Sequence, residues 1–497
     1  MTTKHHDRQV YPPLVRPLRH VALAFVRLGV VGVALASASV DGAQENQSAT
    51  PAPQQALQAT AQAPQGPLPP TPPPQAPPAA PQRPPVVNRL NEVLPSWLRV
   101  RAEQRSRFEG FDGGGFVSGR DDDYYLNRFR FNATVQPSAS FSFTAQVQDA
   151  RVADKSVGPT GAPFRDQLDL RMAYADIGSA RARVATRVGR QELAFGDQRL
   201  VGHVSWLNTG RTFDGARVTY RSTPFQLDVF GSSVVAIDDE SFNESDFDAS
   251  QFYGAYGALG TLVPKAVVEP YVFYRISRDV RSELGAMADL QAATIGVRWV
   301  GGLPAGFDYN TEMAFQTGSL GQDDVRAWAG HWQLRKTLSA RRGLRAIGEY
   351  NFASGDASPT DGTRGTFDQL YPTGHDKYGL ADQVGWKNIN HVRAGGEVLA
   401  RKGLVVSSSY HTWWLADAHD ALYNAAGAVV ARVARGAASR HVGQELDVLA
   451  SYAVSPQLQI AGGYAHIFPG AFLREATPGA SYSAPYVMVT YVFLAEK

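Results

Sequence analysis

Residues 188–218 combine four arginines and three carboxylates with five glycines. Arginine offers a planar set of N–H donors that bind carboxylate or phosphate in a fixed geometry. Arg128 and Arg130 are two residues apart, and Arg217 and Arg221 are four apart. Both spacings put the two side chains on one face of a β-strand. The chemistry indicated is the binding of anions along a row of guanidinium groups. The alternative is that the same arginines pair with carboxylates and only make the structure rigid.

A second polar stretch, residues 367–389, contains His375, Asp376, Tyr378 and Asp382. These residue types can move protons. They lack a partner constellation of nucleophile, base and orienting acid, which catalysis would require. We therefore expect a structured extracellular loop at this position, and we expect the protein not to be an enzyme.

Cation and cofactor chemistry finds little support in the composition. The acidic runs 121–123 and 238–248 offer ligands for calcium, or for a divalent bridge to lipopolysaccharide, but a solvated acidic loop explains them equally simply. The chain has no cysteine, which excludes disulfides, thiolate metal sites and a lipidated N-terminal cysteine. The formal net charge of +2 selects no charged partner. We assign no metal ligand and no cofactor, and we expect no nucleic-acid partner.

The elements that position these residues follow from a period-two pattern after Trp97. From Leu126 to Gln136, arginine, asparagine, threonine and glutamine alternate with phenylalanine, alanine and valine. This alternation is typical of strands with two unlike faces. In an outer-membrane barrel, the apolar face contacts lipid and the polar face lines a wet interior.

Eighteen such strands can be placed along the chain. They are expected near residues 98–108, 124–136, 140–151, 166–178, 181–193, 212–222, 225–236, 250–260, 267–278, 289–300, 306–317, 325–337, 342–354, 388–400, 403–414, 440–454, 457–468 and 484–493. Their connections alternate between long and short, as in barrels with short periplasmic turns and long outer loops. The long connection 194–211 is dense enough in specific polar groups to fold inward and narrow a channel. The sequence therefore predicts an all-β fold, a transmembrane antiparallel up-and-down barrel of about 18 strands.

The N-terminal region predicts export. Basic residues precede the apolar run 28–36, and small residues at 36–38 form a cleavage site, with a second one after Ala43. Residues 39–94 are rich in proline, alanine and glutamine, a composition that predicts a disordered tether. The expected domains are thus a signal peptide (1–38), the tether (39–94) and the barrel (95–497).

The two polar stretches resemble the alginate export family of outer-membrane proteins. The resemblance covers roughly residues 95–497 and rests on four motifs, at 189–192, 196–199, 208–215 and 372–388. It implies an 18-stranded barrel that lets an anionic polysaccharide leave the cell through an arginine-lined constriction. A long periplasmic plug loop known in the family has no counterpart at the short turn near Ser455 and Pro456.

The resemblance also implies roles for individual residues. The arginines expected to line the pore and contact the substrate are Arg128, Arg130, Arg190, Arg211 and Arg217. The acids expected to hold arginines in place are Glu192, Asp197 and Asp214.

These observations together favour a passive anion-conducting channel in the outer membrane of a Gram-negative bacterium. The expected cargo is an anionic polysaccharide such as a uronate polymer. The alternatives are a general porin for small organic anions or sugars and, from other classes, a surface adhesin or a barrel enzyme. Expected partners are outer-membrane lipid, lipopolysaccharide and a periplasmic protein bound through the proline-rich tether.

Overall fold

The computed structural model describes residues 89–179, 181–260, 265–282 and 285–494. The expected export signal and the tether as far as residue 88 lie outside the described residues. The described chain opens with the short helix α2 (Leu90–Val93). Within it, the Asn91 side chain donates to the carbonyl of Val100 at 2.7 Å and accepts from the Val100 N–H at 2.9 Å. This pair of hydrogen bonds ties the end of the expected tether to the first strand.

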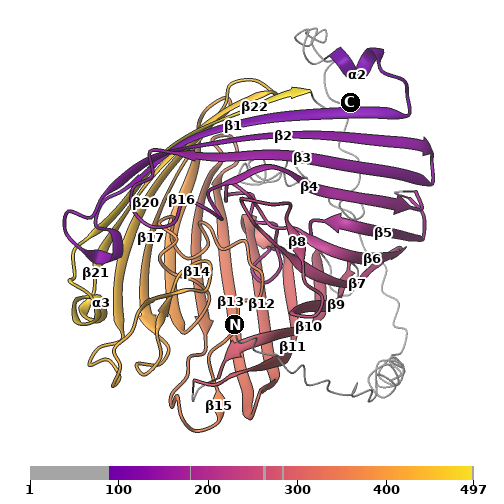
Figure 1. Ribbon diagram of the computed structural model, residues 1–497. Coiled ribbons are helices and arrows are strands. Elements are labelled where there is room, and N and C mark those ends of the chain that lie inside the picture. Colours follow the sequence, from indigo (N-terminus) through magenta and orange to yellow (C-terminus); the bar gives the residue numbers. More distant parts are fainter. Residues whose placement is uncertain (1–88, 180, 261–264, 283–284, 495–497) are drawn as a thin grey trace, which may run out of the picture. The chain divides into compact units, whose positions relative to one another are not determined.

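In the described part of the chain, eighteen long strands form one antiparallel sheet, which closes into a barrel because β1 pairs with β22 (Figure 1). Their bounds are β1 (Leu98–Phe111), β2 (Asp122–Ser138), β3 (Phe141–Ala153), β4 (Asp166–Ile177), β5 (Val184–Gln191), β6 (Phe213–Ser222), β7 (Phe225–Ala236), β9 (Ser250–Leu259), β10 (Ala266–Arg281), β11 (Met287–Leu303), β12 (Phe307–Leu320), β13 (Asp323–Ser339), β14 (Leu344–Ala353), β16 (Ile389–Arg401), β17 (Leu404–Leu415), β20 (His441–Ala453), β21 (Leu458–Pro469) and β22 (Tyr482–Leu494).

Short elements decorate the loops. They are β8 (Glu244–Ser245), β15 (Thr363–Arg364), the β18 (Leu422–Tyr423) and β19 (Val429–Ala431) pair, α3 (Ala471–Ala476), and the 3-10 turns η4 (Gly114–Phe116) and η5 (Pro304–Gly306). Among the described residues, no helix is long and apolar enough to cross a membrane.

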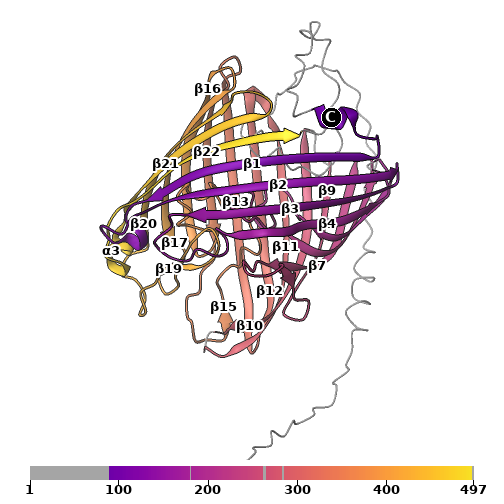
Figure 2. The same cartoon turned by 45° about the horizontal axis from the view of Figure 1, so that its top comes forward.

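The predicted strands are confirmed, and each lies within a few residues of its expected bounds. The two unlike faces are also present. Phe129, Phe315 and Tyr464 are exposed on the outer surface, whereas Arg128 and Arg130, which alternate with Phe129, are buried inside. Figure 2 shows how the strands run side by side around the wall. The apolar outer side chains form the surface that a barrel presents to lipid.

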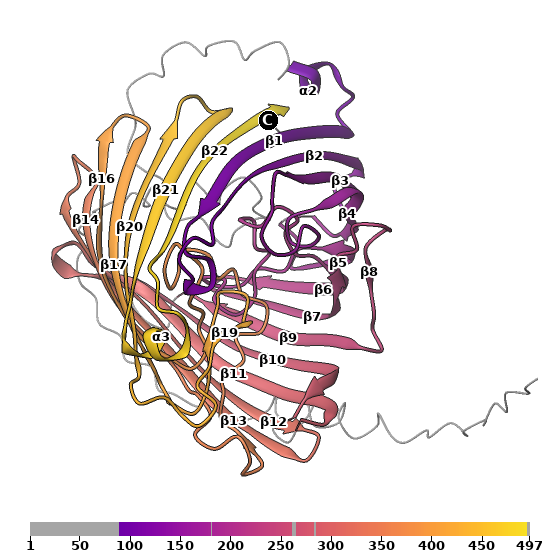
Figure 3. The ribbon, with the colours of Figure 1, turned by 60° about the vertical axis from the view of Figure 1, so that its left-hand side comes forward.

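Two long loops fold into the barrel and together form the inner plug, defined as residues 192–212 and 354–388. Their contacts with inward-facing strand residues confirm the expectation that the first loop folds inward. The second loop was expected outside the cell. It lies within the barrel as well, where its aromatic side chains are buried against the inner faces of β14 and β17. Figure 3 shows the neighbouring loop that carries β19 within the ring of strands.

The inner plug gives the barrel a hydrophobic core. Phe195 stacks at 5.3 Å on Phe230 and at 5.0 Å on Tyr256, which are inward-facing residues of β7 and β9. Trp386 and Trp413 have no exposed surface in the same cluster. An empty lumen would expose these rings to water, so their burial holds the plug against the wall.

Candidate functional site

Five arginines on the inner face of β1, β2 and β4 bind the first loop of the plug. We call them the basic wall: Arg105, Arg107, Arg128, Arg130 and Arg171. Each has at most 7% of its surface exposed. Their guanidinium groups donate to backbone carbonyls of residues 205–209; Arg105, for example, reaches the Ser205 oxygen at 2.7 Å and Arg107 the Trp206 oxygen at 2.6 Å. Arg128 and Arg130, predicted to contact substrate, are therefore covered by the plug.

The motif at residues 208–211 shapes this contact. The Asn208 amide donates to the carbonyls of Asn127 on β2, Arg151 on β3 and Phe164 in the loop before β4, and the Thr209 carbonyl accepts from Arg130 and Arg171. Gly210 has a φ of +77°, and a Cβ there would lie 2.9 Å from Arg171 Nη2. Only glycine lets the backbone approach the guanidinium groups this closely in that conformation.

Arg211 joins the two loops of the plug to each other. Its guanidinium donates to the carbonyls of Gly202 and Pro372, at 3.2 and 3.0 Å. Burial, together with the charge of Arg275, lowers the pKa of Arg211 to about 10. The backbones of Val201 and Tyr371 also pair directly. Arg211, predicted to contact substrate, thus binds peptide carbonyls within the plug.

The motif at residues 196–199 carries the strongest charge contacts of the plug. Arg199 lies 3.2 Å from Asp197 and 3.1 Å from Glu349 of β14, and Lys377 lies 3.5 Å from Asp197. Burial favours the neutral acid, but the charges of Lys377 and Arg199 hold the pKa of Asp197 well below its usual range. Asp197 therefore holds Arg199 and Lys377, two cations that were not assigned from the sequence.

A second wall faces the plug from β13 to β20. We call it the histidine–acid wall: His331, Glu349, Asn351, His391, His411, Glu445 and Asp447. Side-chain nitrogens and oxygens connect neighbouring members in sequence at 2.7 to 2.9 Å from His331 through Asn351 and His391 to His411. The two carboxylates at the end of the row accept from plug amides, Glu445 from the Ala381 N–H at 3.0 Å and Asp447 from the Leu380 N–H at 3.2 Å.

Trp206 locks the plug loops together in front of the basic wall. Its ring is stacked on His375 with 3.7 Å between the ring centroids, and the Arg107 guanidinium lies 3.7 Å from the centroid of the Trp206 ring. The His375 imidazole in turn lies 2.8 Å from Asp382. His375 and Asp382 thus have a packing role in the plug, which explains their presence without catalysis.

Nearer the short turns, inward-facing arginines form cross-strand ion pairs, which we call the ion-pair ring. The pairs are Arg187–Asp176 at 2.7 Å, Arg217–Asp228 at 3.8 Å, Arg298–Glu269 at 2.5 Å, Arg335–Asp308 at 2.5 Å and Arg345–Glu397 at 3.1 Å. Between 13% and 31% of each arginine side chain is exposed. These guanidinium groups are held in place yet keep surface that a solute can reach.

The other predicted residues lie near the start of the first plug loop. Arg190 shares a strand face with Val184 and Val188, which are exposed on the outer surface. Asp214 binds Arg190 bidentately, at 2.9 and 3.0 Å. Glu192, expected to hold a neighbouring arginine, instead pairs with Arg171 of the basic wall.

Sequence reasoning did not assign Arg105, Arg107 and Arg171 to the site. Their partners lie up to 103 residues away in the chain, so no local spacing reveals the contact. The available signal was the alternation of arginine along the strand at residues 98–111, which places Arg105 and Arg107 on one face.

The acidic outer runs are engaged by protein groups. Asp122 accepts from the N–H of Val157 and pairs with Lys155, and Asp239 pairs with Arg165. Within the described residues, no group of three or more acidic or histidine ligands has an arrangement that would hold a metal ion.

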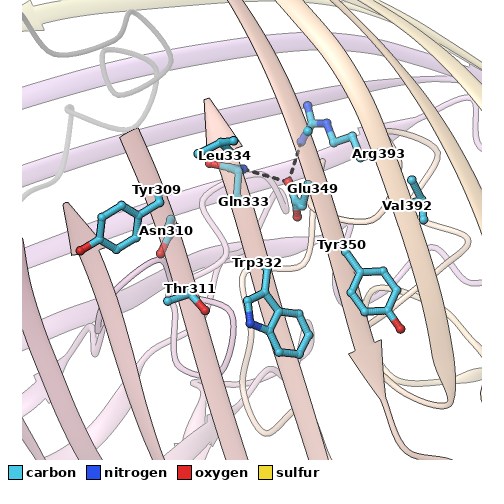
Figure 4. Close-up of a pocket in the computed structure, with 11 residues that line it drawn as sticks. Tyr309, Asn310, Thr311, Trp332, Gln333, Leu334, Glu349, Tyr350, Val392 and Arg393 are labelled. Carbon is cyan, nitrogen blue, oxygen red and sulfur yellow. Dashed lines mark hydrogen bonds and ion pairs between the residues drawn. The ribbon is translucent and has the colours of Figure 1, made fainter. Parts of the chain in front are cut away.

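A hollow of about 570 Å³ lies against β12, β13, β14 and β16 (Figure 4). Trp332 and Tyr350, which line it, are exposed on the outer surface, and a Cβ at Gly348 would meet nothing within 4 Å. Gln333 and Arg393, drawn in the same view, reach toward Glu349 on the inner side. Outward-facing and inward-facing residues of the wall thus both line the hollow.

Residues 96–487 match the family model described as Alginate export. Among solved structures, the chain is similar to Pseudomonas aeruginosa OccK5 (OpdH), with 12% identity and a TM-score of 0.54 over 80% of this chain and 97% of that one. It is also similar to Pseudomonas aeruginosa OpdQ, with 13% identity and a TM-score of 0.55 over 80% and 97%. For Acinetobacter baumannii OccAB2 the values are 11% and 0.52 over 79% and 97%. At these identities the likeness shows the fold alone. No curated protein matches the chain in sequence.

Proposed function

Because the chain belongs to the alginate export family, whose model spans its barrel, we propose that it is a passive channel for anionic polysaccharide. The protein is an outer-membrane β-barrel with the fold of a porin. Uronate polymers such as alginate are the first candidate cargo. Each sugar of such a polymer carries a carboxylate, the group that arginine binds best.

The observation that carries this proposal is the ion-pair ring. Its arginines face the lumen from several strands, and each is partly neutralised by a neighbouring carboxylate. A carboxylate entering a narrow pore loses water, and exposed guanidinium donors replace that water. Because each site is already half satisfied, binding is weak enough to allow release and movement to the next arginine.

The predicted pore residues contribute to different extents under this proposal. Arg217 belongs to the ion-pair ring and is the predicted arginine best placed to meet cargo. Arg190 is on the outer strand face and pairs with Asp214. This position does not support the lumen contact predicted for it. Arg128, Arg130 and Arg211 are held by the inner plug, so their contact with cargo requires the plug to move.

A second function is favoured by the inner plug itself. Two loops fill part of the lumen with a packed hydrophobic core. The narrowed lumen suits a small solute better than a polymer. A porin for small organic anions or sugars would use the same ion-pair ring without moving the plug.

The test is electrical recording from the protein in planar bilayers. We expect anion selectivity in a salt gradient, and block of the current by an oligogalacturonate but not by an uncharged oligosaccharide of equal length. Block by galacturonate monomer alone would favour the small-anion porin. Cation selectivity, or no response to either acid, would refute the proposal.

Two single substitutions locate the effect. Arg217→Gln should weaken anion selectivity and reduce oligogalacturonate block. Arg190→Gln is the matched control, because it removes the same charge from the outer strand face. If both changes alter selectivity equally, the ion-pair ring does not determine it.

A further inference from the structure

The basic wall carries more positive charge than its neighbours neutralise. Three of its five arginines have carboxylate partners: Arg107 with Glu109, Arg128 with Glu103, and Arg171 with Glu192. Among the described residues, no carboxylate oxygen lies within 4.0 Å of the other two, Arg105 and Arg130. The hydrogen-bond acceptors of these two buried guanidinium groups are all neutral, and Glu103, opposite Arg130 in the strand register, already pairs with Arg128.

Those neutral acceptors are mostly backbone carbonyls of the plug. Arg105 donates to the Ser205 and Leu207 oxygens at 2.7 and 3.0 Å, and Arg130 to the Thr209 oxygen at 3.4 Å. The Nε donors of Arg105 and Arg128 find no protein acceptor although they are buried. The wall thus has both unbalanced charge and unused donors, each of which costs free energy inside a protein.

A carboxylate would correct both deficits. It brings a full negative charge and two acceptor oxygens, and it can bind a guanidinium group through two parallel hydrogen bonds. The carbonyls of residues 205–209 occupy the positions where such an oxygen would bind. They mimic, at lower strength, a row of carboxylates along the wall.

We propose that the basic wall is a carboxylate-binding site which residues 205–209 occupy in the resting channel, and that an oligouronate opens this part of the lumen by displacing them. The proposal rests on the proposed function and adds the regulation of passage. Residues 205–209 are the element to be displaced because the wall holds them mainly through backbone carbonyls. The Trp206 ring, stacked on His375, is a side-chain contact that displacement must also break. The rest of the plug is fixed by buried side chains, such as Phe195 against β7 and Arg199 against Glu349.

Asn208 sets the threshold for displacement. Its amide donates to the carbonyls of Asn127, Arg151 and Phe164 at 2.9 to 3.2 Å, and these contacts involve no arginine. They hold the segment down independently of the charge on the wall. Asn208→Ala removes them, together with one acceptor of Arg105 at 3.4 Å, and should make displacement easier.

The experiment measures exposure of the segment by cysteine labelling. The chain has no cysteine of its own, so a single introduced thiol reports one position. Thr209 is 2% exposed and keeps its carbonyl contacts when changed to cysteine. Ala381, 6% exposed against the histidine–acid wall, is the matched control. Full-length Thr209→Cys and Ala381→Cys proteins in lipid vesicles are treated with a neutral methanethiosulfonate, with and without oligogalacturonate. Current block is recorded on the same proteins.

The expected result is a rise on the order of tenfold in the labelling rate of Thr209→Cys with oligogalacturonate. A neutral malto-oligosaccharide should have no effect, and Ala381→Cys should not respond. Adding Arg105→Gln and Arg130→Gln should abolish the response. If that variant does not fold, Asn208→Ala with Thr209→Cys provides the test, because its response should require less oligogalacturonate.

Two outcomes would overturn the inference, and they are distinguishable from failure of the proposed function. If oligogalacturonate blocks the current while Thr209→Cys labelling stays constant, the channel function stands and the displacement does not occur. Equal increases at Thr209→Cys and Ala381→Cys would also overturn it, since the whole plug would then loosen regardless of the arginines. Absence of both block and labelling change would remove the proposed function and the inference together.

Discussion

The basic wall and the histidine–acid wall bind the same plug through opposite halves of the peptide group. On β1, β2 and β4, arginine donors take up the carbonyls of residues 205–209. On β20, the acceptors Glu445 and Asp447 take up the N–H groups of Ala381 and Leu380. A loop buried in a barrel has to satisfy both kinds of backbone group. The sign of the charge on each wall therefore matches the backbone group that it binds: cations bind carbonyls, and acids bind N–H groups.

The walls also differ in how their charge is balanced. In the histidine–acid wall, hydrogen bonds between side chains connect His331, Asn351, His391 and His411 in a row. The basic wall consists of long cations that repel one another and depend on the loop. The first is suited to fixing a loop permanently, and the second to holding one that an anion can replace.

The largest expected effect comes from removing a buried acid. Glu349→Gln should lower the free energy of unfolding by about 3 kcal/mol, because Arg199 loses a counter-charge at 3.1 Å in a site with no exposed surface on the acid. Glu103→Gln on the basic wall should cost only about 1 kcal/mol, since Arg128 keeps its plug carbonyls. Urea unfolding of the lipid-reconstituted protein measures both. Equal losses would contradict the contrast between the walls.

Acid should weaken the basic side of the plug through Glu192. Burial opposes its ionisation, but His203, Arg171 and Arg130 lower the pKa of Glu192 to about 2. In the unfolded chain that pKa is about 4.3. The ionised acid therefore stabilises the fold fully above about pH 4.3, and this contribution, on the order of 2 kcal/mol, is lost as the pH falls toward 2.

Glu192→Gln isolates that contribution. The stability difference between the wild-type protein and Glu192→Gln should be present at about pH 6 and should shrink by about pH 3. Unfolding free energies at the two pH values provide the measurement. A difference that stays constant would mean that the Glu192 charge does not stabilise the plug.

Replacing one glycine by alanine in each plug loop, and measuring the loss of unfolding free energy, compares the rigidity of the two walls. Gly210 and Gly379 both have positive φ, +77° and +130°. Their added Cβ atoms would lie 2.9 Å from Arg171 Nη2 and 2.8 Å from Glu445 Oε1. Backbone strain alone costs about 1–2 kcal/mol at each site. Gly379→Ala should cost more, because a long arginine can move aside and the short buried acid cannot. The reverse order in unfolding measurements would show that the basic wall is the more rigid one.

The smallest effect is expected at an ion pair that belongs to neither wall. Arg326 pairs with Asp324 at 2.7 Å, but 70% of its side chain is exposed. Arg326→Gln should change stability by less than about 0.5 kcal/mol and leave oligogalacturonate block unaltered. A larger change in either measurement would indicate that surface charge, rather than the inner walls, dominates the behaviour of the channel.

The strands could be predicted from the sequence because their signal is local. Each crosses an apolar layer, so every second residue has to be apolar, and Leu126–Gln136 shows this without reference to any other part of the chain. The alternation of loop lengths then favoured a membrane barrel over a sandwich. Family resemblance also located the polar stretches that form the inner plug.

The partners inside the plug could not be predicted, because they are distant in the chain. Arg199 meets Glu349, 150 residues away, and Arg105 meets Ser205, 100 residues away. Nothing in the spacing distinguishes an arginine that lines water from one that binds a loop carbonyl. For that reason Arg128 and Arg130 were expected in an open lumen, and loop 367–389 was expected outside the cell.

The closing seam of the barrel has a consequence for how the cylinder is held shut. β1 and β22 are far apart in the chain and meet only when the cylinder shuts. Trp206, from the middle of the chain, contacts both sides of this junction: the Arg107 guanidinium on β1 at 3.7 Å and the Tyr486 ring on β22 at 4.9 Å. Because Trp206 bridges the junction from within, the first plug loop adds side-chain contacts to the backbone pairing that closes the cylinder.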